Sequence, residues 1–111
     1  MSKQDDAFLE KLMQHIDDNK RKWMPNGIEL DLYCIRLIYR ASDTDHTVEV
    51  ESTNNWAVIT VELPGREGPK AFVFDSDRAK RLYDFLLPIA VPRLKKKNSS
   101  ARKAITDALG L

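Results

Sequence analysis

The sequence contains one cysteine, two histidines and four glycines in 111 residues, and each shortage excludes a class of site. Cys34 is alone, so no intramolecular disulfide can form and a reducing, cytoplasmic compartment is expected. A structural zinc site needs three or four cysteine or histidine ligands, and the chain has one cysteine and two histidines in different predicted elements, so we expect no zinc site. The glycines form neither a dinucleotide-binding fingerprint nor a phosphate-binding loop, so we expect no nucleotide cofactor.

Long apolar runs are also missing. No stretch approaches the roughly 18 apolar residues of a membrane span, and the first residues lack the profile of a signal peptide. Hydrophobic residues make up 42% of the chain and charged residues 32%, which is typical of a globular protein with its own core. We therefore expect residues 1–111 to form one domain that makes no contact with a membrane.

The spacing of the apolar residues predicts an α+β fold. A helical period of 3.6 runs from Lys3 to about Trp23. Four short runs rich in β-branched and aromatic residues follow, each bounded by turn-forming residues, at 28–39, 46–52, 56–63 and 70–75. These runs predict a four-stranded antiparallel meander behind an N-terminal helix.

The first of these runs changes its pattern halfway. Its apolar residues occupy even positions up to Leu32 and odd positions from Tyr33 onward. This change favours a strand covered on both faces, or one with a bulge near Tyr33 and Cys34, and a short helix is the competing interpretation. Apolar residues on both sheet faces then suggest either helices on both sides or a second copy covering one face, as in a homodimer.

The C-terminal third predicts two further helices. The first is capped by Asp75, Ser76 or Asp77 and should end or kink at Pro88, because proline disfavours helical geometry before it and removes a donor. The second is a short amphipathic helix that begins at Ser99 or Ser100 and ends at Gly110. Residues 92–100 are accordingly expected to form a basic linker before the last helix.

Charge is distributed unevenly, although the net charge is only +1. Residues 1–51 hold 7 Lys and Arg against 11 Asp and Glu, whereas residues 52–111 hold 11 against 6. Six cations lie within eleven residues, with no acidic residue among them: Arg93, Lys95, Lys96, Lys97, Arg102 and Lys103. A second basic cluster, Lys20, Arg21 and Lys22, precedes Trp23.

The basic C-terminal segment predicts contact with the phosphate backbone of DNA or RNA. Six cations beside a helix N-terminus would supply both charge and backbone N–H donors to phosphate groups. The cluster at 20–22 would extend this surface if the fold brings the two together. The competing interpretation is a solvated linker followed by the polar face of a helix.

The remaining polar residues do not indicate catalysis. His15 is expected to pair locally with Asp18 or Lys11, and Cys34 lies in the most apolar stretch, which predicts a buried, unreactive thiol. Two pairs of aspartates also have structural explanations. Asp43 and Asp45, beside His46, are typical of a polar loop, and Asp75 and Asp77 are typical of helix caps. We therefore expect a protein that is not an enzyme.

Aromatic residues offer a second route to nucleic acid. Phe72 and Phe74 share one face of the last predicted strand beside Lys70, with Trp56 on the neighbouring run, an arrangement used for base stacking. With only nine aromatic residues in the chain, burial in the core is the favoured interpretation.

Together these patterns predict a small, non-catalytic binding or regulatory protein that contacts nucleic acid. The alternative is a protein-binding adaptor or inhibitor. Such a protein would use an apolar face of the sheet or the acidic N-terminal half.

Overall fold

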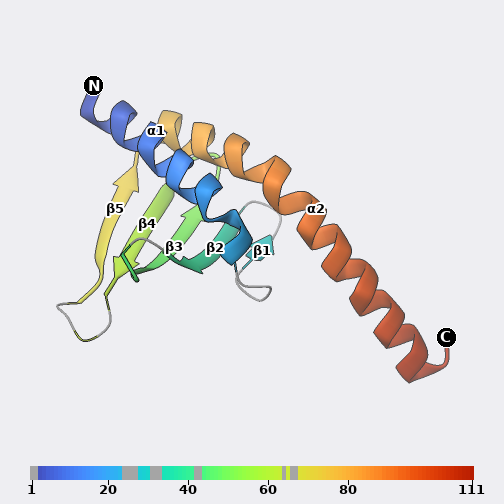
Figure 1. Cartoon of the computed structure of the whole chain (residues 1–111). Coiled ribbons are helices and arrows are strands. Elements are labelled where there is room, and N and C mark those ends of the chain that lie inside the picture. Colours follow the sequence, from blue (N-terminus) through green and yellow to red (C-terminus); the bar gives the residue numbers. More distant parts are fainter. Residues whose placement is uncertain (1–2, 24–27, 31–33, 42–43, 64, 66–67) are drawn as a thin grey trace.

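The computed structural model describes residues 3–23, 28–30, 34–41, 44–63, 65 and 68–111 (Figure 1). An N-terminal helix, α1 (Lys3–Asp18), is followed by a 3-10 turn, η1 (Lys20–Lys22), and by a five-stranded antiparallel sheet. The strands are β1 (Ile28–Leu30), β2 (Ile35–Arg40), β3 (Thr47–Ser52), β4 (Ala57–Glu62) and β5 (Lys70–Phe74), paired in sequence order. A long helix, α2 (Ser76–Leu109), completes the chain and confirms the α+β class.

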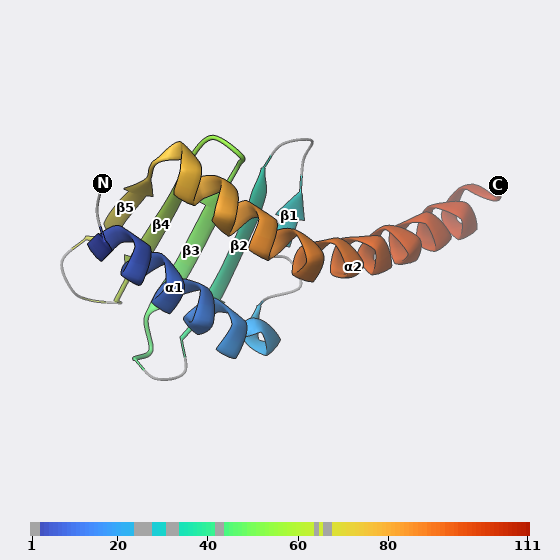
Figure 2. The same ribbon diagram turned by 90° about the horizontal axis from the view of Figure 1, so that it is seen from above.

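Both helices cover the same face of the sheet, as Figure 2 shows from above. Strand residues alternate along β3, where Val48 and Val50 are buried and Thr47 and Glu49 are half-buried on the other face. This alternation, which the sequence of the run already contains, is typical of a strand with one face on the core. Of the two alternatives for the sheet faces, helices on both sides is wrong, because α1 and α2 lie side by side on one face.

The run at 28–39 forms two strands instead of one. β1 and β2 pair antiparallel, with Ile28 opposite Leu37 and Leu30 opposite Ile35. Directly paired positions of antiparallel strands share a face, so the change from even to odd apolar positions marks a hairpin. A bulge is expected near Tyr33 and Cys34, and Tyr33 lies outside the described residues. The competing helix is wrong, because β1 and β2 occupy the described residues on either side.

The C-terminal third forms one helix instead of two. α2 continues through Pro88 and Pro92 to Leu109, so the basic linker expected at 92–100 and the separate short helix are both replaced by the second half of α2. The cap predictions at its two ends are confirmed. Asp75 accepts a hydrogen bond from the backbone N–H of Arg78, and Gly110 ends the helix in the left-handed region at φ 68°.

The position of the two prolines explains why the helix continues. Pro88 and Pro92 are four residues apart and exposed, whereas Leu82, Leu86 and Ala90 form the buried stripe on the opposite side. A proline inside a helix costs about 3 kcal/mol because it removes a hydrogen bond and crowds the preceding turn. On the exposed side, water can bind the carbonyls that lose their partners, while the buried stripe on either side of Pro88 holds the helix on the sheet.

The second half of α2 leaves the body of the molecule. Leu94 is the last α2 residue that packs against the core, and in the segment 95–111 only Thr106 is not exposed. We call residues 95–109 the arm; it is orange to red in Figure 1, where it extends past the end of the sheet near β1. Fifteen helical residues span about 22 Å, which accounts for the elongated dimensions of 55 × 34 × 22 Å.

Candidate nucleic-acid interface

The arm carries five of the six predicted C-terminal cations. Helical spacing sets two of them, Lys95 and Arg102, seven residues apart on one side, and Lys96 and Lys103 seven residues apart on the adjacent side. All five are exposed; they are Lys95, Lys96, Lys97, Arg102 and Lys103. None of them pairs with an acidic group anywhere in the part of the chain that the structure describes.

The sixth cation, Arg93, contacts Trp23 and η1. Its guanidinium lies 4.8 Å from the centre of the Trp23 ring and donates a hydrogen bond of 2.8 Å to the backbone carbonyl of Lys20. A cation over the face of tryptophan is attracted by the ring quadrupole, and the indole itself is buried. Arg93 therefore ties the base of the arm to η1 and is not free to contact a ligand with all its donors.

This contact brings the two basic clusters of the sequence together. Lys20, Arg21 and Lys22 form η1, and all three side chains are exposed beside the base of the arm. Lys20 is paired with Asp17 at 3.2 Å, whereas Arg21 and Lys22 make no ion pair with the described residues. The hydrogen bond from Arg93 to the Lys20 carbonyl thus links the base of the arm to η1, which lies 73 positions earlier in the chain.

The helix N-terminus predicted at Ser99 or Ser100 is absent. Both serines lie inside α2, where backbone N–H groups bond to carbonyls of the preceding turn and are not directed at a ligand. The side chains remain available, and Lys95, Asn98, Ser99 and Arg102 line a shallow depression on one side of the arm. The surface therefore offers side-chain charge and hydroxyl or amide donors, without a helix dipole.

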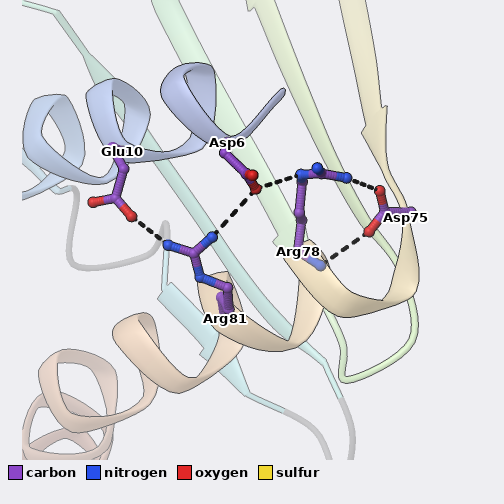
Figure 3. Close-up of polar contacts among 5 residues, drawn as sticks. All are labelled: Asp6, Glu10, Asp75, Arg78 and Arg81. Carbon is purple, nitrogen blue, oxygen red and sulfur yellow. Dashed lines mark hydrogen bonds and ion pairs between the residues drawn. The ribbon is translucent and has the colours of Figure 1, made fainter. Parts of the chain in front are cut away.

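Two acidic residues of the N-terminal half, Asp6 and Glu10, form ion pairs with the first turns of α2, as Figure 3 shows. Asp6 accepts hydrogen bonds from Arg78 at 2.9 Å and from Arg81 at 3.5 Å, and Glu10 pairs with Arg81. Arg78 also pairs with Asp75 at the start of α2, and its side chain is only 11% exposed. These ion pairs fasten α1 to the first turns of α2, so part of the acidic surface is already occupied.

The same contacts shift the pKa values of Arg78 and Asp75. Hydrogen bonds to Asp6, and then to Asp75, raise the pKa of Arg78 above its ordinary value. The backbone N–H of Arg78 lowers the pKa of Asp75, and the Arg78 side chain adds to this effect. Each shift favours the charged form, which is typical of ion pairs that support a fold.

His15 and Asp45, two of the polar residues considered as catalytic candidates, each have a side-chain partner in the fold. The hydroxyl of Tyr39 lies 2.8 Å from Nδ1 of His15, a partner 24 residues away that the local pairing prediction missed. Asp45 pairs with Arg40 at 2.6 Å, which holds the pKa of Asp45 below its ordinary value, and Asp43 lies outside the described residues. Among the residues that the structure describes, no group of three acidic, histidine or cysteine side chains could hold a metal ion.

The aromatic residues form core contacts. Phe8 of α1 meets Phe72 edge-on at 4.9 Å and stacks on Phe74 at 5.6 Å. Phe74 is buried and Phe72 is half-buried against the core, so the expected burial is confirmed for Phe74 and is partial for Phe72. Trp56, the residue before β4, is not part of this cluster and is 41% exposed. Cys34 is half-buried, so the predicted burial of its thiol is only partial.

Within the described ranges, no helix combines the length and the apolar character that crossing a bilayer requires. Comparison of the chain with protein-family models, with curated proteins and with solved structures gives no match.

Proposed function

We propose that this chain is a small, non-catalytic protein that binds the phosphate backbone of DNA or RNA through the arm and η1. The single observation that carries the proposal is the set of five exposed arm cations that lack acidic partners among the described residues. A fold that needed these charges for its own stability would pair them, as it pairs Arg78 and Arg81. Their exposure on a projecting helix supports an external polyanion as the partner.

The geometry supports recognition of charge and not of base sequence. Cations on adjacent sides of a helix can contact phosphates on both sides of a groove, and lysine acts toward phosphate as a point charge. Phe72 and Phe74 pack under α1, so they are not available for base stacking on this surface. We therefore expect binding that varies little with sequence and falls steeply with salt.

The test is fluorescence anisotropy of labelled single- and double-stranded DNA and RNA at several salt concentrations. Five phosphate contacts with duplex predict a log–log salt slope of about −4 to −5. The variant Lys95→Gln, Lys96→Gln, Lys97→Gln should weaken binding to every sequence and make the slope shallower by about 3. It should keep its melting temperature, because none of these side chains is buried.

The matched control removes the same charge elsewhere. Lys3, Lys11 and Lys80 are exposed on α1 and on the body-packed half of α2, and their triple replacement by Gln should change the affinity much less. Equal loss of affinity in both triple variants would show that net charge alone is responsible. Unchanged affinity in the arm variant would overturn the proposal.

A protein-binding adaptor or inhibitor is the second candidate, favoured by the sheet face that neither helix covers. Val73 lies between Phe72 and Phe74, which pack under α1, so it belongs to the other face, where it is 63% exposed. Trp56 lies exposed before β4. The same face carries a cross-strand ion pair of 3.4 Å between Arg36 and Glu51, which is typical of a solvated surface. Affinity capture from a nuclease-treated extract discriminates, because a protein partner survives nuclease whereas a nucleic-acid bridge does not.

A further inference from the structure

A cavity of about 360 Å³ lies between α1 and the end of the sheet formed by β2, β3 and β4. It is distant in sequence from the arm, and the basic surface does not include it. Its walls are apolar: Phe8 and Leu12 of α1 face Ala41, Val48 and Val61. Leu12, Ala41 and Val48 are buried, so the cavity reaches down to the hydrophobic core.

Polar groups converge on this apolar cavity from three segments. Both histidines of the chain, His15 from α1 and His46 from the residue before β3, are among its lining residues. His15 is held in place by its hydrogen bond of 2.8 Å with the hydroxyl of Tyr39, which is fully buried. Because His15 and His46 are 31 residues apart, only the packing of α1 on the sheet brings them together.

The charged groups on the cavity favour an anion. Lys11 is exposed on α1 beside the opening and makes no ion pair within the described ranges, so its ammonium can meet a ligand. His46 adds a side chain that can donate a hydrogen bond. No carboxylate is among the described residues that line the cavity, since Asp45 is turned to Arg40.

We propose that this cavity binds a small apolar monocarboxylate, with the hydrocarbon part against Phe8, Leu12 and Val61 and the carboxylate at Lys11 and His46. Sites for small molecules are concave and mainly apolar, with a few polar groups that fix orientation, and 360 Å³ lies within their usual range. A ligand with about ten non-hydrogen atoms would bind with a dissociation constant on the order of 0.1–1 mM.

The experiment is a titration of the full chain with sodium octanoate, followed by two-dimensional NMR of the backbone amides. Saturable shifts are expected in α1 and around 39–48, with little change in the arm. Lys11→Gln should weaken octanoate binding about three- to tenfold, because an exposed ion pair contributes modestly. Lys3→Gln, on the same helix but outside the cavity, should leave the affinity unchanged.

A second pair of variants tests the cavity independently of charge. Val61→Phe places a larger side chain in the cavity and should abolish binding, whereas Val58→Phe places the same ring on the opposite face of β4 and should not. Thermal denaturation of each variant verifies that the fold survives. Shifts that do not saturate, or that persist in Val61→Phe, would overturn the site, and 1-octanol binding as tightly as octanoate would overturn carboxylate recognition.

Discussion

Arg78 is the residue at which the two helices are fastened together. Its guanidinium contacts Asp6, which lies 72 residues earlier, and Asp75, which caps α2 three residues before Arg78. The planar guanidinium offers several donors in a fixed arrangement, so one arginine can hold two carboxylates from different elements. Its side chain is also far less exposed than that of Arg81, at 11% against 47%.

Replacement of these arginines by lysine therefore has unequal effects. Arg78→Lys keeps the charge but loses the geometry that reaches both partners, and we expect the melting temperature to fall by several degrees. Arg81→Lys should change it by no more than about 2 °C, because exposed ion pairs contribute little. Thermal denaturation followed by circular dichroism measures both values. Equal effects at the two positions would contradict the role assigned to Arg78.

Asp75 predicts a dependence of stability on pH. Hydrogen bonding by the backbone N–H of Arg78, and then by its side chain, lowers the pKa of Asp75 in the folded state below the ordinary 3.8. The folded state is therefore stabilised by the ionised carboxylate above pH 3.8, and this stabilisation is lost as pH falls through the lower folded-state pKa.

The variant Asp75→Asn isolates the charge, because asparagine is also a good N-cap. We expect its melting temperature to lie a few degrees below that of the unaltered protein at pH 7. The difference should shrink as the pH is lowered below 3.8. Asp84→Asn, at an exposed site paired with Lys80, is the control. A deficit that stays constant with pH would show that geometry and not charge is responsible.

Among the helices and strands, the sequence pattern predicts which face of a strand is buried better than it predicts where a strand begins and ends. Alternation at Val48 and Val50 and at Ala57 and Ile59 predicts the buried face of β3 and β4, which the structure confirms. The β1–β2 hairpin was missed because the segment 31–34, Asp-Leu-Tyr-Cys, lacks the Gly, Pro or Asn-Gly signals that mark a tight turn. The pairing of β1 with β2 explains why the apolar residues of this run change from even to odd positions.

The continuity of α2 leads to a prediction at Pro88. Pro88→Ala restores a backbone donor on the exposed side of an unbroken helix, so we expect the free energy of unfolding to rise by about 1–3 kcal/mol. Urea denaturation measures this change. Leu86→Ala, in the buried stripe next to it, should lower the stability by about 2–5 kcal/mol. A loss of stability in Pro88→Ala would mean that the proline has a favourable role.

At the scale of the whole molecule, the chain divides at Leu94 into a packed body and the arm. Every residue in the hydrophobic core lies at or before this position. A chain that ends at Leu94 should therefore keep the melting temperature within about 3 °C, while losing helical signal and affinity for nucleic acid. Circular dichroism and anisotropy measure these properties. Failure to fold would indicate that the arm packs against something in solution, such as a second copy.

The amphipathic α1, the strand alternation, a helix cap at one of residues 75–77 and the basic character of residues 93–103 could be predicted from the sequence alone, because these features depend on neighbours within a few positions. Three features were decided only by tertiary structure. Packing of Leu86 and Ala90 on the sheet carries α2 through its prolines, the position of α1 beside α2 pairs Asp6 with Arg78, and the same packing brings His15 to Tyr39. Each joins segments far apart in the chain, and only the complete sheet with both helices on one face sets their distance.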